Sequence, residues 1–166
     1  MWQTVWSTVA LEFTDVSDIE TITQISLRLV VAAILGGIIG YERELKSRDA
    51  GLRTHILVCM GTAIFVIGPT QAGMPIEDMS RVLQGIIQGM GFLGAGAIVV
   101  GTIKQRTQGL TTAAGVWATA GIGVAVGLGL EATAVLATLF VVTTLGVLPL
   151  LRNPDRELGA DTDEKK

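Results

Sequence analysis

The sequence predicts an all-α, polytopic membrane protein with five transmembrane helices. Hydrophobic residues make up 49% of the 166 residues and charged residues only 16%, whereas soluble proteins carry about 25% charged residues. The mean hydropathy is +0.57. The apolar residues also fall into five stretches, each close to the roughly 20 residues that a helix needs to cross a bilayer. This composition excludes a soluble globular protein.

In chain order, the predicted transmembrane helices cover residues 22–41, 52–68, 82–101, 110–130 and 132–151. Together they form one transmembrane domain, residues 22–151. Residues 1–21 precede it as a segment on the outer face, where Trp2 and Trp6 suit the headgroup layer of the membrane. Residues 152–166 follow as a charged cytoplasmic tail.

The positive charges predict the orientation, because cytoplasmic loops retain Lys and Arg during insertion. Only Arg28 and Arg81 lie on one side of the predicted helices, both at helix starts. We therefore expect the N-terminus outside and the C-terminus in the cytoplasm. The other ten of the twelve basic residues lie on the opposite side: Arg43, Lys46, Arg48, Arg53, Lys104, Arg106, Arg152, Arg156, Lys165 and Lys166.

The third predicted helix carries a polar face. Arg81, Gln84 and Gln88 are spaced by three and four residues and so share one side of the helix. With Arg28, at the equivalent point of the first helix, they form a candidate polar membrane site. Two arrangements of the arginines stay open. Their side chains either extend to the lipid headgroups or turn inward to pair with carboxylates or helix-end carbonyls.

Small residues mark the faces on which we expect helices to approach closely. One pair lies on the first helix and one on the third, and we expect a homodimer through either. The fifth helix, rich in branched residues, is expected to pack outside the others. The candidate packing residues are the pairs Gly36 and Gly40, and Gly85 and Gly89, together with Gly94, Gly96, Gly109 and Thr112.

An internal repeat is a further hypothesis. Residues 51–54 (GLRT) and 109–112 (GLTT) open the second and fourth helices in the same way. Two hairpins would then lie side by side as a parallel repeat, related by an axis along the membrane normal, as in some transporters. Chance similarity among apolar sequences is the alternative.

Several functions are disfavoured. The net charge is −3, and twelve scattered cations provide no broad basic surface for nucleic acid. Cys59 is the only cysteine, which excludes disulfides, and with His55 it offers two metal ligands, too few for a site. The sequence contains no nucleophile–base pair and no phosphate-binding loop, so we expect neither enzyme activity nor a cofactor. Asp78, beside Glu77, is a candidate magnesium contact, with helix capping as the alternative role.

Four motifs resemble the MgtC/SapB family of bacterial inner-membrane proteins. They are LGGIIGYERE at 35–44, AGLRTH at 50–55, GFLGAG at 91–96 and GLTTAA at 109–114. The resemblance implies a role in magnesium homeostasis and stress adaptation, exerted by modulating a membrane complex such as an ATPase, and in pathogens a role in virulence. The alternative, which the paired hairpins and the polar face favour, is a transporter or channel for magnesium, another ion or a small solute.

Two features set this chain apart within the family it resembles. The fifteen residues after Leu151 are too few for the soluble C-terminal domain of longer members, so a short form is expected. Thr111 also stands where the MgtC branch tends to have asparagine, which places the chain nearer the SapB branch.

The first two motifs also contain charged residues at the cytoplasmic boundary. Glu42, Arg43 and Arg53, with His55 in the same motifs, are expected to form a packed network at this end of the bundle. Glu44 is a further candidate member. A solvated loop is the alternative.

Overall fold

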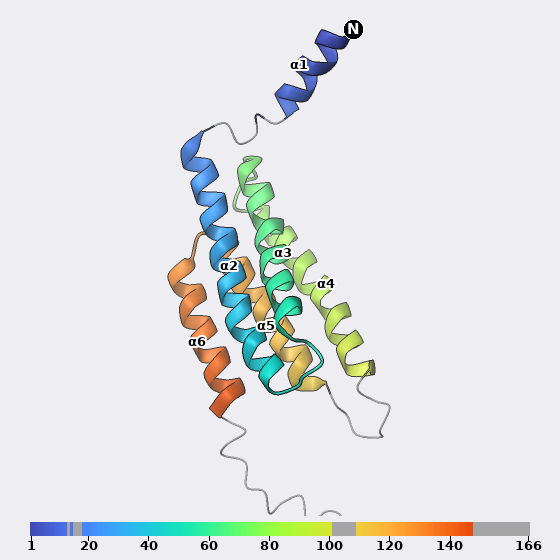
Figure 1. The fold of residues 1–166 in the computed structure, drawn as a ribbon, viewed down its shortest axis with the longest axis vertical. Coiled ribbons are helices and arrows are strands. Elements are labelled where there is room, and N and C mark those ends of the chain that lie inside the picture. Colours follow the sequence, from blue (N-terminus) through green and yellow to red (C-terminus); the bar gives the residue numbers. More distant parts are fainter. Residues whose placement is uncertain (13, 15–17, 101–108, 148–166) are drawn as a thin grey trace, which may run out of the picture.

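Helices make up the fold in Figure 1, a computed structural model that describes residues 1–12, 14, 18–100 and 109–147, the side chains of 99 and 100 excepted. The five predicted stretches correspond in order to the last five helices. Of these, the first, second and fourth are long and apolar enough to cross a membrane, and the last is a shorter apolar helix. The predicted class, an all-α polytopic membrane protein, is confirmed. The helices are α1 (Trp2–Glu12), α2 (Ile19–Leu45), α3 (Leu52–Gln71), α4 (Met79–Val100), α5 (Leu110–Gly127) and α6 (Glu131–Val147).

Polar residues extend α2 beyond its predicted ends. The helix begins at Ile19 rather than residue 22, because the side chain of Asp18 accepts a hydrogen bond from the backbone N–H of Thr21 at 2.7 Å and caps it. This bond lowers the pKa of the Asp18 carboxyl group. At its other end α2 continues to Leu45 through charged residues that the apolar pattern excluded.

Three predicted segments lie partly or wholly outside the described residues. They are most of the loop after α4, the end of the fifth predicted helix, and the charged tail, residues 152–166. The predicted outer segment, residues 1–21, contains α1 and the start of α2. Every residue of α1 is exposed, and the helix stands apart from the bundle (Figure 1). Its position on the membrane surface stays a prediction.

Successive helices from α2 to α6 run in alternate directions, so the described turns between them lie at two ends of the bundle (Figure 1). We name the end with the turns at 72–78 and 128–130 the acidic end, since it carries Glu77, Asp78 and Glu131. The opposite end, with the turn at 46–51 and the end of α6, is the basic end. α5 lies at the centre and contacts α2, α3, α4 and α6. α6 packs on α2 and α5, at the outside, as expected for the fifth helix.

Glycines let α2 and α5 press directly on the backbone of α3. A Cβ atom at Gly36 would lie 2.6 Å from the backbone oxygen of His55, and one at Gly40 would lie 2.7 Å from Cα of Leu52. A Cβ atom at Gly123 would overlap the backbone oxygen of Cys59. Gly36 and Gly40 are therefore filled within the chain, and the expectation that they form a dimer contact is wrong. Of the two helix faces predicted as dimer contacts, the face of α4 is the remaining candidate.

The two hairpins α2–α3 and α4–α5 lie next to each other through α3 and α5. Both α3 and α5 are followed by a glycine in the left-handed region, Gly73 at φ +75° and Gly129 at φ +79°. The packing within the hairpins differs, because Gly94 of α4 leaves ordinary contact space of 3.7 Å to Cβ of Ala113. The duplication stays a hypothesis.

Cysteines placed at the two ends test the predicted orientation. In a Cys59→Ser background, Ser47→Cys is expected to react only from the cytoplasm and Met74→Cys only from outside, because both positions are exposed and lie at opposite ends. The measurement is labelling by a membrane-impermeant maleimide in intact cells and in inverted vesicles. Reaction of both positions from one side would contradict the five-helix topology.

Candidate functional site

Polar side chains gather at both ends of the bundle, and at the acidic end they centre on Arg28 of α2. Its Nη1 donates to the backbone oxygen of Gly127, at the end of α5, over 3.0 Å. Its Nε lies 3.8 Å from Oε1 of Glu131, the first residue of α6. Gly129 makes room for the guanidinium, since a Cβ there would lie 2.6 Å from Nη2. Arg28 thus turns inward and neutralises the negative end of α5.

Arg81 has a different environment, although it stands at the equivalent point of the second hairpin. Its side chain is exposed and has no hydrogen bond or ion pair with any described residue. The same holds for Gln84 and Gln88 on the same face of α4. One chain therefore does not bring Arg28 and Arg81 together in one site. Asp78 is exposed just before α4, and the described residues contain no cluster of three metal-ligating side chains.

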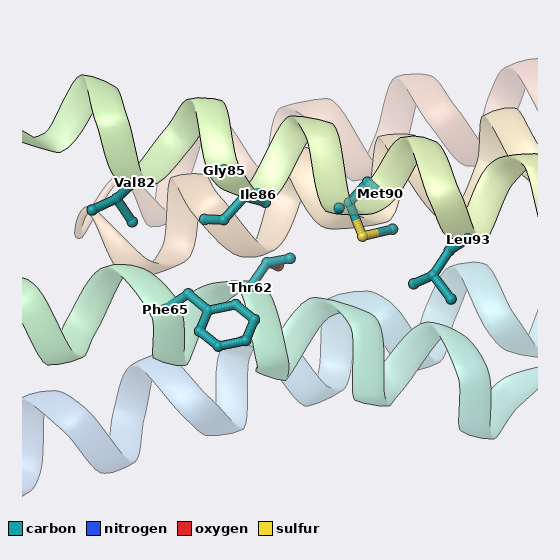
Figure 2. Close-up of a pocket in the computed structure, with 8 residues that line it drawn as sticks. Thr62, Phe65, Val82, Gly85, Ile86, Met90 and Leu93 are labelled. Atoms are coloured by element: carbon teal, nitrogen blue, oxygen red, sulfur yellow. The ribbon is translucent and has the colours of Figure 1, made fainter.

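The polar face of α4 adjoins open space. A Cβ atom at Gly85, Gly89 or Gly96 would meet nothing within 4 Å. Between α3 and α4 runs a groove of about 480 Å³. Figure 2 shows Val82, Ile86, Met90 and Leu93 of α4 along one wall, with Thr62 and Phe65 of α3 along the other.

The contrast between the two arginines yields a prediction on stability. Arg28→Ala is expected to lower the stability of the purified chain by about 1 to 3 kcal/mol, because the Gly127 oxygen and Glu131 lose their partner. Arg28→Lys is expected to rescue little, since a point charge cannot replace the planar fork. Thermal melting in one detergent measures both.

Arg81→Ala is the matched control, because it removes the same charge from an exposed side chain. We expect its melting temperature to equal that of the parent protein under conditions that keep the chain monomeric. Equal melting of Arg28→Ala and Arg81→Ala would contradict the inward pairing of Arg28.

At the basic end, the last turn of α2 holds the end of α6. Arg43 is only 2% exposed. Its Nε donates to Glu42, and its Nη2 donates to the backbone oxygen of Leu145 over 3.3 Å. Lys46 donates to the same oxygen over 2.9 Å and lies 2.6 Å from Oε1 of Glu42. Arg43 and Lys46 thus contact the Glu42 carboxylate and the negative end of α6. These contacts offset the desolvation cost of burying Arg43.

Glu44 caps the start of the neighbouring helix, α3. Its Oε2 accepts a hydrogen bond from the backbone N–H of Leu52, the first residue of α3, over 2.8 Å. Gly51 permits this approach, because a Cβ there would lie 2.9 Å from the same oxygen. The carboxylate satisfies one free N–H group at the positive end of α3.

His55 is fully buried one turn further into α3. Its Nδ1 lies 3.0 Å from the backbone oxygen of Gly51, and its Nε2 has no hydrogen-bonding partner among the described residues. Nε2 faces α5, where a Cβ at Gly115 would lie 3.7 Å away. The ring thus lies between the start of α3 and the second turn of α5.

The remaining packing candidates position α5. Gly109, directly before α5, has φ +97°, and a Cβ there would overlap the backbone oxygen of Ala97 in α4. Only glycine combines this left-handed conformation with so close a contact. Thr112 is buried in the first turn of α5.

The segment that builds these clusters is also the part with known relatives. A family model described as the MgtC family matches residues 29–153. The chain belongs to the MgtC family. The match includes the network at the basic end, the polar face of α4 and the end of α5.

Three relatives illustrate the family. Protein SrpB of Synechococcus elongatus is 42% identical over 132 residues, which cover 73% of this chain and 72% of SrpB. Protein MgtC of Brucella abortus is 42% identical over 125 residues, 75% of this chain and 51% of that protein. The protein named "Putative magnesium transporter YhiD" of Escherichia coli is 42% identical over 100 residues, 56% of this chain and 46% of YhiD. The chain thus spans about half the length of the last two. No solved structure matches it significantly.

In this MgtC-family chain, the network differs from the predicted one, because Lys46 and the Leu145 oxygen belong to it, whereas Arg53 and His55 form no hydrogen bond with Glu42 or Arg43 in the described part of the chain. Arg53 is exposed and has no partner among the described residues. Lys46 and the oxygen of Leu145 were not foreseen, although Glu42 and Lys46 have the i, i+4 spacing that favours ion pairs on a helix. No sequence signal pointed to Leu145, because a backbone oxygen is available on every residue.

Proposed function

We propose that this MgtC-family membrane protein is a regulator in magnesium homeostasis and stress adaptation that acts by contact with a larger membrane complex, such as an ATPase. Its family and the name of its YhiD relative support the link to magnesium. We place it in the bacterial inner membrane, with the N-terminus outside and the C-terminus in the cytoplasm, on the distribution of basic residues.

The observation that carries this proposal is the exposed polar face of α4 beside a closed interior. Between α3 and α5, Cys59, Ala63 and Val66 are fully buried, and the glycines of α5 press on them. That interface offers no space for an ion. Gln84 and Gln88, by contrast, need a polar partner within a bilayer, where unsatisfied groups are costly. The open glycines beside them permit a second helix to approach closely.

We further propose that a second copy of the chain covers this face when the larger complex does not, so that the free regulator is a homodimer. Glutamine amides donate and accept hydrogen bonds, so two copies related by a two-fold axis can satisfy each other's Gln84 and Gln88. Asp78 and Arg81 stand at the same end of the face with opposite charges, which suits cross-pairing about that axis. Gln88→Cys in a Cys59→Ser background is expected to form an intermolecular disulfide in the membrane when copper phenanthroline is added as the oxidant, and a chain that stays monomeric under this treatment would contradict the dimer.

The alternative function, transport of magnesium, another ion or a small solute, is favoured by the groove between α3 and α4. If a second copy closed this groove, Arg81, Gln84 and Gln88 would line the junction. Purified protein in liposomes separates the two functions. A regulator gives no magnesium or proton flux above that of empty liposomes. Flux that Arg81→Ala abolishes would overturn the regulatory proposal in favour of transport.

A further inference from the structure

We propose that Nε2 of His55 is a proton-binding site, and that a proton bound there loosens the attachment of α6 to α2 at the basic end. The inference does not depend on the contact proposed for α4. It starts from a buried ring nitrogen that none of the described protein groups engages.

The hydrogen bond at the other ring nitrogen fixes the state of the neutral imidazole. The Gly51 oxygen, 3.0 Å from Nδ1, can only accept a hydrogen bond. Nδ1 therefore carries the hydrogen, and Nε2 presents a lone pair to the interior. This is the tautomer in which Nε2 is free to take up a proton.

The surroundings of the ring contain few groups that can respond to that proton. α5 has no charged residue between Leu110 and Gly127, and on α6 Leu145 packs near Gly115. On α3 itself, the nearest other ionisable residues are Arg53, which is exposed, and Cys59. At the end of α2, which packs on the start of α3, the charged residues are Glu42, Arg43 and Lys46 of the basic-end network and Glu44, which accepts from the N–H of Leu52.

Protonation converts Nε2 from an acceptor to a donor, and a carboxylate is the acceptor it favours. No described carboxylate contacts Nε2, which faces the space bounded by Gly115 and the side chain of Leu145. A charged His55 is therefore buried without an acceptor, and water can supply one only by displacing the Leu145 side chain. Because Arg43 and Lys46 bind the backbone oxygen of this same Leu145, its displacement weakens the attachment of α6.

The chain is well suited to a test, because His55 is its only histidine. Nitrogen NMR of the full chain, labelled at histidine and purified in detergent, is expected to show the Nδ1–H tautomer at about pH 8. Observation of the Nε2–H tautomer would overturn the proposal, since Nε2 would then carry a hydrogen before any proton is bound.

Melting as a function of pH tests the consequence. Between about pH 8 and about pH 5.5, where histidine is the side chain that normally titrates, the melting temperature of the parent chain is expected to fall. The fall should be absent in His55→Gln, because its amide takes up no proton in this range. Equal pH dependence in both proteins would overturn the proposal.

Gly115 supplies a matched pair that keeps the histidine. Gly115→Ser places a hydroxyl group within reach of Nε2, whereas Gly115→Ala fills the same space without a donor. The serine variant is expected to melt above the alanine variant at about pH 8, where the ring is neutral, because its hydroxyl donates to the lone pair of Nε2. Equal melting of the two variants at this pH would contradict a site at Nε2, even if His55→Gln failed to fold.

Discussion

Leucine at both Gly36 and Gly40 is expected to prevent α2 from packing on α3 and so to unfold the bundle. At each position even a Cβ atom lies within 2.7 Å of the α3 backbone, which cannot turn aside as a side chain can. The loss at each site should therefore reach or exceed the upper end of the about 1 to 3 kcal/mol that inserted methylenes typically cost in a packed core. Two such losses are comparable to the whole stability of a small protein, about 5 to 15 kcal/mol.

The measurement uses Cys59, which is fully buried in the parent chain. Its reaction with a maleimide in detergent should become fast in the Gly36, Gly40 double variant. The matched control carries leucine at Gly85 and Gly89, where a Cβ meets nothing within 4 Å. In that variant Cys59 should stay protected from the maleimide. Only the association should be lost, so that the protein has the mass of a monomer in detergent. Protection of Cys59 in both variants would show that close contact between α2 and α3 does not hold the bundle together.

Removal of the Arg43 side chain is expected to have the second large effect. Arg43→Ala leaves Glu42 with Lys46 alone and withdraws one donor from the Leu145 oxygen. Breaking a buried ion pair by removing one partner typically costs about 3 to 5 kcal/mol. Because Lys46 keeps part of the network together, we expect the lower end of that range. Arg43→Lys should recover little, because a single ammonium group cannot occupy the two separate positions from which Nε and Nη2 of Arg43 donate to Glu42 and Leu145.

Arg53→Ala is the control for Arg43→Ala. Both residues belong to the family motifs near the basic end, and both carry one positive charge, but Arg53 is exposed. Its replacement should shift the melting temperature little, as for other surface substitutions. A similar loss of stability in the two alanine variants would show that the charge, rather than the buried contacts of Arg43, matters at this end.

The order and approximate bounds of the apolar helices α2 to α6 follow from the sequence. In a bilayer every backbone polar group must be paired within the segment, so an apolar stretch of sufficient length has no alternative to a helix. The family motifs were equally local, since they are strings of consecutive residues. The ends of α2 were less well predicted, because Asp18 and the charged residues after Tyr41 extend the helix beyond its apolar part.

The partners of the polar and small residues were decided only by the tertiary structure. Arg28 and Arg81 stand at equivalent points of the two hairpins. Arg28 donates a hydrogen bond to the backbone oxygen of Gly127, whereas the side chain of Arg81 is exposed. The glycine pairs of α2 and α4 likewise share one spacing, but only the first faces another helix of the chain. Arg28 and Gly127 are 99 residues apart, and Arg43 and Leu145 are 102 apart. A local pattern fixes which face of a helix is polar or small, whereas the packing of all the helices fixes what that face meets.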